Sequence, residues 1–283
     1  MSEWPLIVFT VAIQLAGGLA LAATCFDWAA ASSDMVMRPL GLAVFPLAAL
    51  GLLVSLFHLG RPLAAWKSLL NLSSSRLSLE ILLTLLFVGA ALLYSHAWWA
   101  ERADHRFALG VVTSVVALSA VVSSSSIYLI PTQPAWNSSW VPVSFIGTTL
   151  LLGGCAAAVV ANLQGTRQFL GFSLGGAVVG SLMLIGAAIW MLSSWSRGAP
   201  DEFTAAQLQG ALQLVTQQHP IWLGLHLVLA GVLPIVFAVL VWFGRSQVVA
   251  PSWMRILLFL AISSGAVIGR KLMYLAATAP GRF

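Results

Sequence analysis

Two ionisable side chains stand at the ends of neighbouring apolar segments. His58 closes one hydrophobic run and Glu80 opens the next, so if both runs cross a membrane, the two residues lie at the same membrane face. An ionisable group beside lipid costs free energy and is usually kept because it has a function. An imidazole can hold a carbonyl oxygen and a carboxylate can accept a proton. The pair therefore favours a site for a small polar-headed lipid such as a quinone.

The segment between these two residues carries three basic side chains: Arg61, Lys67 and Arg76. Arg61 follows His58 by about one helical turn, where its guanidinium can stabilise negative charge on a bound head group. Simpler interpretations stay open for both ends of the segment. His58 can hydrogen-bond a loop carbonyl as many helix-end residues do. Glu80 can be a first-turn acid that the helix dipole favours, with Ser78 as the helix cap.

The composition is that of a membrane protein. Hydrophobic residues make up 60% of the 283 residues, against 13 basic and 8 acidic ones, and the mean hydropathy is +0.96. Soluble domains of this size do not have such a composition. The formal net charge of +5 rests on scattered basic residues without a dense patch. It indicates contact with lipid head groups and excludes nucleic acid as a predicted partner.

Eight apolar segments are long enough to cross a bilayer, which takes roughly 20 residues. Backbone polar groups cannot stay unpaired in lipid, so each segment is predicted to be a helix. The predicted spans form one anchor domain over residues 1–283 and cover residues 5–26, 38–58, 78–100, 107–130, 143–162, 169–192, 220–243 and 255–277. The sequence thus predicts an all-α integral membrane protein, an eight-helix transmembrane bundle with both termini on the same side.

The face that carries both termini, called side B, also carries the longer connections, at residues 59–77, 131–142 and 193–219. Long loops often provide binding surface, so side B is the predicted face for docking a partner. In the last connection, Asp201 and Glu202 open a segment with helical apolar spacing, which predicts a short surface helix. The opposite face is called side A. Basic residues divide almost evenly between the faces, so the positive-inside rule assigns no orientation.

Three more side chains near side B are candidates for the same site. His226 lies six residues inside the seventh span, where it can face the cavity or pair with His58 as an axial ligand of a haem b. Arg270, near the end of the eighth span, can snorkel to the membrane surface or orient a carbonyl or Glu80. Tyr128 follows the fourth span in a Trp-rich stretch, which is typical of interfacial anchors and also compatible with lining the site.

Patterns for other chemistry are missing from the sequence. Cys25 and Cys155 lie in separate hydrophobic runs without metal-ligand spacing, so no metal site is predicted in this chain. No nucleotide-binding loop or serine triad is present. The spans lack the repeated polar residues of a channel and the buried charge chain of a pump. Four acids on side A are predicted to be solvated loop charges: Asp27, Asp34, Glu101 and Asp104.

Several short motifs run along the chain: Glu3-Trp4-Pro5-Leu6, His58-Leu59-Gly60-Arg61-Pro62, Ser78-Leu79-Glu80, Pro134-x-Trp136, and Ile268-Gly269-Arg270 with Tyr274. In these motifs the chain resembles the membrane anchor subunits of DMSO reductase-type molybdoenzymes, over nearly its full length. Two positions depart from the family pattern, with Ala266 where an acid is expected and His226 where an arginine is expected. Both departures are compatible with a different quinone or with reversed electron flow, because related anchors serve sulfite-oxidising molybdoenzymes.

The resemblance implies a subunit that exchanges electrons between a membrane quinone and a docked protein, without acting itself on the final substrate. Menaquinone or ubiquinone would bind at His58 and Glu80, which would handle the protons. The resemblance and the residue types together predict that four more residues surround the bound quinone: Arg61, Tyr128, His226 and Arg270. A haem b-containing electron-transfer anchor and a non-redox structural anchor or transporter remain as alternatives.

Partners and location also follow from the resemblance. It implies a ferredoxin-like iron–sulfur subunit with four clusters and a molybdopterin catalytic subunit, so that the clusters and the molybdopterin belong to other chains. This chain itself would hold no metal. It implies a multi-pass protein of the bacterial cytoplasmic (inner) membrane, in contact with membrane lipid.

Overall fold

The computed structural model describes residues 3–29, 37–58, 66–67, 71–72, 75–163, 167–199, 201–243 and 251–278, leaving out the side chains at positions 58, 167 and 168. The described residues are helical apart from turns and short loops, and they contain no strand. Eight helical segments in the described ranges are long and apolar enough to cross a membrane. The predicted all-α, eight-helix membrane architecture is therefore confirmed.

The α-helices are α1 (Trp4–Ala29), α2 (Arg38–Ser55), α3 (Arg76–Trp99), α4 (Ala103–Ser126), α5 (Trp140–Leu163), α6 (Arg167–Ser196), α7 (Glu202–Gln213), α8 (Pro220–His226), α9 (Leu233–Phe243) and α10 (Ser252–Ala276). A π-helical stretch, Leu227–Val232, joins α8 to α9, so the three together make the seventh span. Each predicted span overlaps an observed one, with ends that differ by about one helical turn. Apolarity marks the bilayer depth, but local capping decides where a helix stops.

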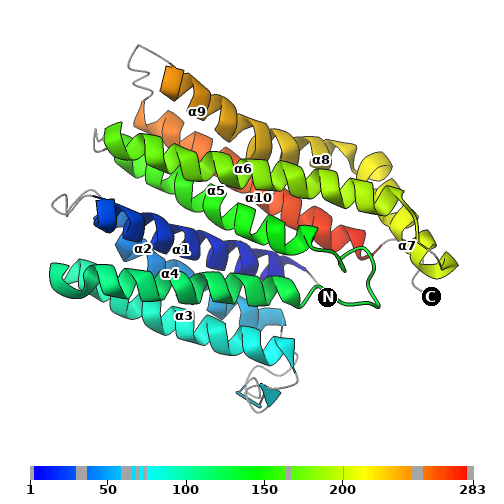
Figure 1. The fold of residues 1–283 in the computed structure, drawn as a ribbon, viewed down its shortest axis with the longest axis horizontal. Coiled ribbons are helices and arrows are strands. Elements are labelled where there is room, and N and C mark those ends of the chain that lie inside the picture. The colour runs from blue at the N-terminus through cyan, green and yellow to red at the C-terminus, as the bar shows by residue number, and fades with distance from the viewer. Residues whose placement is uncertain are drawn as a thin grey trace.

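The spans form two groups of helices that lie side by side (Figure 1). The first group contains α1 to α4, and the second contains α5, α6, α8, α9 and α10. The main contact between the groups is made by α1 and α5, and α10 also reaches α1. The start of α1 and the end of α10 lie at the same end of the bundle as α7, and this end is side B. The interface between the groups therefore extends to side B.

Glycines let the central helices come close together. A Cβ atom built on Gly18 of α1 would lie 2.8 Å from the Cα atom of Gly153 on α5. Within the second group, a Cβ atom on Gly180 of α6 would lie 2.6 Å from the carbonyl oxygen of Gly147 on α5. Side chains at these crossings would push the helices apart, as at other small-residue interfaces in membranes. These close approaches fix where α5 crosses α1 and α6.

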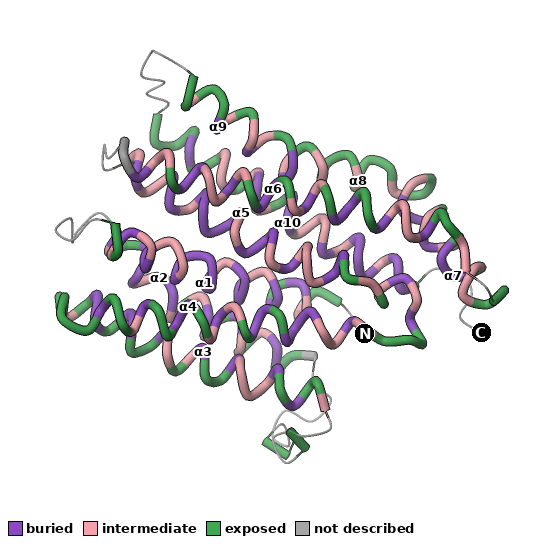
Figure 2. The backbone as a smooth tube through the Cα atoms, in the orientation of Figure 1, coloured by how far each residue is buried: buried purple, intermediate pink, exposed green. Residues whose placement is uncertain are grey.

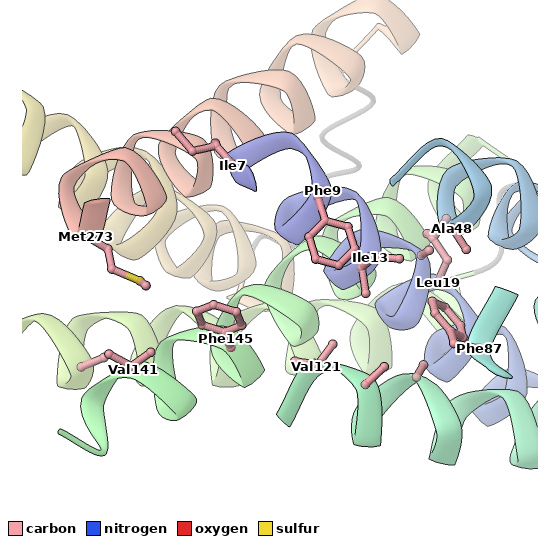
Figure 3. Packing of buried hydrophobic residues seen from close by; sticks show 14 of the residues in the cluster. Ile7, Phe9, Ile13, Leu19, Ala48, Phe87, Val121, Val141, Phe145 and Met273 are labelled. Atoms are coloured by element: carbon pink, nitrogen blue, oxygen red, sulfur yellow. The ribbon is translucent and has the colours of Figure 1, made fainter. Parts of the chain in front are cut away.

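Buried apolar side chains fill the space between the two groups. Figure 3 shows Phe9 and Ile13 of α1, Phe145 of α5 and Met273 of α10 among the members of this core. Exposed residues lie mainly along the outer faces, as on α3 and α9 (Figure 2). Many of these exposed residues are apolar, which suits surfaces that face lipid.

Side chains cap two of the helices that begin at side B, α3 and α7. Ser75 caps α3 by accepting a hydrogen bond from the backbone N–H of Ser78 at 3.3 Å. The assignment of Ser78 as the cap is therefore wrong, because the helix begins at Arg76, two residues before the apolar run. The predicted surface helix is confirmed as α7. Its cap is Asp201, which accepts from the backbone N–H of Thr204 at 2.8 Å, and this bond lowers the pKa of the Asp201 carboxyl.

Side A contains a buried ion pair that corrects a prediction. Asp27 is not a solvated loop charge, because α1 continues past the predicted span and carries it inside the bundle. The Arg106 guanidinium donates to both Asp27 oxygens at 2.9 to 3.1 Å, and both side chains are 9% exposed. Arg106 also lies over the ring of Trp98, 4.0 Å from its centroid.

The other acids of side A differ from Asp27. Glu101 is exposed, as predicted, although it pairs with Arg38 at 2.8 Å. Asp104 is exposed in the first turn of α4. Asp34 lies outside the described residues. Among the described acids of side A, only Asp27 has a largely buried side chain, and it is paired with Arg106.

Candidate functional site

Five buried polar side chains gather toward side B where the two helix groups meet. They are called the side B cluster and comprise Gln14 of α1, Glu80 of α3, Tyr128 after α4, and Arg270 and Tyr274 of α10. The sequence predicted Glu80, Tyr128 and Arg270 as site residues. The structure brings these three together from three separate parts of the chain.

Arg270 occupies the centre of the cluster and is 5% exposed. Its guanidinium donates to the side-chain oxygen of Gln14 at 3.1 Å and lies 3.5 Å from the ring centroid of Phe145. No acidic side chain among the described residues forms an ion pair with it. The Arg270 Nε and the Gln14 amide nitrogen are buried without an acceptor in the described structure. Unpaired buried donors cost free energy, so both favour a ligand with an acceptor oxygen.

Tyr128 and Tyr274 form a hydrogen-bonded pair through their hydroxyl groups. Trp136 packs edge-on against both rings, at centroid distances of 5.2 and 5.9 Å. Burial, the neighbouring Tyr274 and the charge of Glu80 raise the pKa of Tyr128 well above its ordinary value. Tyr128 therefore stays protonated at neutral pH and can serve as a hydrogen-bond donor.

Glu80 lies in the second turn of α3 and is 8% exposed. It lies beside Ser124 of α4 and acts electrostatically on both Tyr128 and Tyr274. It makes no ion pair within the described part of the chain. A buried carboxyl without a cation, next to proton-carrying hydroxyls, is suited to taking up or giving a proton.

The loop over residues 127–139 closes the cluster from the side B surface. The Trp136 indole donates to the carbonyl oxygen of Met273 at 2.7 Å, and the Gln133 amide donates to that of Ala277 at 3.4 Å. Arg76 fixes the start of the loop by donating to the carbonyl oxygens of Ser126 and Leu129, at 2.8 and 2.9 Å. Arg76 thus caps the end of α4 and does not extend into the cluster.

His226 lines a cavity next to the cluster. The cavity lies among α5, α6, α8 and α10 and shares Arg270 with the cluster. The Nδ1 atom of His226 lies 2.8 Å from the carbonyl oxygen of Gly265. A side chain at position 269 would collide with the imidazole, so Gly269 leaves room for it. A π-helical stretch begins directly after His226, a feature often found at functional sites.

Two predicted residues fall outside what the structure describes. The backbone of His58 ends a 3-10 turn at side B, but its side chain lies outside the described residues, as does all of Arg61. Their place in the site, and a haem held by His58 and His226, therefore stay predictions. Within the described ranges, no three His, Cys, Asp or Glu side chains lie close enough together to hold a metal ion.

Sequence reasoning missed Gln14 and Tyr274 as site residues. A signal existed for each of them. Gln14 is the only side-chain amide in α1, and a polar group at mid-span needs a partner. Tyr274 follows Arg270 by four residues, which places both on the same face of a helix.

Comparison with known proteins agrees with the motifs of the sequence. The family model described as DMSO reductase anchor subunit (DmsC) matches residues 1–275. The chain is 31% identical over 167 residues to the anaerobic dimethyl sulfoxide reductase chain YnfH of Escherichia coli K12, covering 56% of this chain and 57% of that protein. It is 32% identical over 171 residues to a second anaerobic dimethyl sulfoxide reductase chain of the same organism, covering 58% and 59%. Each of these matches spans less than two thirds of the relative.

A solved structure has a similar arrangement of helices. The bd oxidase from Geobacillus thermodenitrificans superimposes with a TM-score of 0.67, covering 99% of this chain and 85% of that chain. The sequence identity between the two is 13%. At that identity the likeness shows the fold alone, because one fold can carry unrelated functions.

Proposed function

The chain belongs to the family of DMSO reductase anchor subunits, and we propose that it binds menaquinol or ubiquinol at the side B cluster in a bacterial cytoplasmic membrane. The proposal rests chiefly on one observation. Glu80 and Arg270 are both buried toward side B where the helix groups meet, and neither has an ion partner among the described residues. Buried charges left unmatched in this way are typical of sites that bind a polar ligand.

The residues fit a quinone head group in three respects. A bound quinol supplies two electrons and two protons. Arg270 and Gln14 carry donors without acceptors, which can hold an oxygen of the head group. Tyr274 can donate or accept a hydrogen bond, and its link to Tyr128 extends the hydrogen-bonded path toward Glu80. Glu80 can take up the released proton, since it acts electrostatically on both tyrosines and has no cation among the described residues to hold it charged.

A route from the bilayer supports the same location. A pocket of about 490 Å³ lies between the start of α1 and the end of α10, and Tyr274 forms part of its wall. A wider groove of about 810 Å³ continues along α10 past Trp4, Trp222 and Lys271. The Lys271 ammonium lies 4.4 Å from the ring centroid of Trp222 and 5.7 Å from that of Trp4. Trp and Lys mark head-group depth, so the groove suits an amphipathic molecule.

Electrons from the quinol need an acceptor outside this chain, because the sequence contains no ligand pattern for a metal centre. We place a ferredoxin-like iron–sulfur subunit with four clusters on side B, above the cluster and beside α7, and a molybdopterin catalytic subunit beyond it. The side B loops and α7 provide the surface for docking. Electron flow toward or away from the quinone is compatible with the same residues.

The variant Glu80→Gln tests the proposal in the complex purified from membranes with its copurifying subunits. Quinol-dependent turnover should fall by about 10²- to 10⁴-fold, because the amide keeps the shape but does not titrate. Quinol binding should fall much less than turnover. The control is Asp104→Asn, an exposed acid on the opposite membrane face, which should leave turnover unchanged. Unchanged turnover in Glu80→Gln, or equal loss of binding and turnover, would contradict the proposed role.

A further inference from the structure

A second buried arginine without an acidic partner lies at the opposite end of the bundle. Arg255 is in the first turn of α10, is 8% exposed, and forms no ion pair with a described residue. Its Nε atom is buried without an acceptor in the described structure. An arginine near the membrane surface usually snorkels toward water. Side chains of the protein cover this one, so its charge has to be balanced inside the bundle.

None of the acids that the structure describes is in place to pair with Arg255. Beyond Asp104, the only acidic residues in the sequence are Asp201 and Glu202, and both lie at side B beside α7. The side A acids that the structure describes belong to the other helix group, and the buried one among them already has an arginine partner. The counter-charge for Arg255 is therefore expected from another molecule.

Arg255 forms one wall of a narrow apolar pocket among α5, α6, α9 and α10. The pocket extends along α10 from Arg255 to Ile262, roughly 10 Å at the helical rise per residue. Ala158 of α5, Leu174 of α6 and Phe237 of α9 line its other walls. The pocket therefore has a cation at its membrane-surface end and apolar walls along the rest of its length.

The pocket lies toward the lipid-facing edge of the bundle. At this end α9 packs on α6 and makes little contact with α10, so the wall between α9 and α10 is thin. Figure 1 shows α9 at the outer edge of the second helix group. A hydrocarbon chain from the bilayer would enter the pocket between these two helices.

The start of α10 adds hydrogen-bond donors at the same point. Its N-cap residue is Pro251, and no side chain caps the first turn. Free N–H groups and the helix dipole favour an anion at a helix N-terminus, whereas they oppose a cation such as Arg255. The position of Arg255 is thus unfavourable for the isolated helix. It becomes favourable when an anion lies between the guanidinium and the first turn.

We propose that this pocket binds one anionic phospholipid, with its phosphate at Arg255 and the start of α10 and with an acyl chain along the pocket. Inorganic phosphate would satisfy the same charge but would leave the apolar walls uncovered. Basic pockets between membrane helices commonly bind acidic lipid head groups. This site lies at side A and does not depend on the quinol site at side B.

The test measures lipid binding by the chain purified in detergent together with its copurifying subunits. Phosphatidylglycerol should copurify with the unmodified protein and raise its melting temperature when added back. The affinity of Arg255→Gln for phosphatidylglycerol should fall by about tenfold, while Arg255→Lys should keep most of it. The control Arg102→Gln removes the same charge from an exposed position on side A and should have no effect.

Three further probes distinguish the sources of the anion. Phosphatidylethanolamine and inorganic phosphate should each stabilise the protein much less than phosphatidylglycerol. Equal stabilisation by either of them, or unchanged lipid binding in Arg255→Gln, would overturn the proposal. If Arg255→Gln does not fold, Ala158→Leu keeps the charge and narrows the pocket, and the proposal then requires that lipid binding is lost.

Discussion

At side A, Asp27 and Arg106 meet through hydrogen bonds of 2.9 to 3.1 Å, whereas at side B the equally buried Glu80 and Arg270 both lack an ion partner among the described residues. Each end lies in the same kind of helix packing and at a similar level of burial. What differs is the partner. The charges of Asp27 and Arg106 neutralise each other, whereas Glu80 and Arg270 face hydroxyl and amide groups.

This difference separates structural charge from functional charge. In a matched buried pair the two charges satisfy each other, so neither is available to a ligand. Removal of one partner leaves the other charge buried and uncompensated. Unmatched groups are held in place by the surrounding fold and keep their capacity to bind or to exchange a proton. The two ends should therefore respond to mutation in opposite ways, with loss of stability at side A and loss of turnover at side B.

The largest expected effect is on stability at side A. Asp27→Ala should lower the free energy of unfolding by about 3–5 kcal/mol, because Arg106 is left buried and charged. Denaturant unfolding of the purified protein measures this loss. The double variant Asp27→Leu with Arg106→Met should recover most of the stability, since no charge is left unpaired. Turnover per folded molecule should not change in either variant, and a drop in it would break the contrast between the two ends.

Replacement of Arg270 should give the reverse pattern. Arg270→Met should lower quinol-dependent turnover by about 10²- to 10³-fold, through loss of a preorganised cation at the head group. Thermal stability should hold or rise, because an unpaired buried charge is removed. A melting curve and a turnover assay on the same preparation decide between the two roles. A large fall in stability with normal turnover of the folded fraction would assign Arg270 to structure.

The tyrosine pair gives a smaller effect. Tyr274→Phe removes one hydroxyl of the Tyr128–Tyr274 hydrogen bond and should slow turnover by roughly tenfold. The matched control is Tyr94→Phe on side A, where a buried tyrosine hydroxyl lies 3.5 Å from that of Thr24. This control should leave turnover unchanged. Equal slowing in both variants would mean that tyrosine hydroxyls matter only for packing.

The smallest effect concerns the loop that closes side B. Trp136→Phe removes the indole hydrogen bond to the Met273 carbonyl oxygen and should lower stability by about 1 kcal/mol. It should also raise the quinol KM, because Tyr128 and Tyr274 lose an edge-on neighbour. Trp195→Phe removes a similar bond to Ala135 at 3.2 Å, away from the tyrosines, and should affect stability alone. An equal rise in KM in both variants would contradict a specific role for Trp136.

The sequence was a good guide wherever a residue type is costly in lipid. Glu80 and Arg270 stood out because ionisable residues are rare in apolar spans, and the structure places both in one cluster. The same reasoning failed for Asp27, because it lay just beyond the apolar run and looked like a loop residue. Helix ends depend on caps such as Ser75, which hydropathy does not reveal. Position along the chain is therefore a weaker guide to burial than residue type.

The sequence alone determined the eight apolar spans, their helical state, and the side of the membrane on which each ionisable residue lies, because span length and backbone pairing in lipid leave few alternatives. Only the tertiary structure decided which charges meet. Asp27 and Arg106 come from α1 and α4, and the side B cluster draws on four separate segments of the chain. Contacts between helices depend on crossings such as that of Gly18 with Gly153, where three-dimensional packing selects the neighbour and no pattern along the sequence records it.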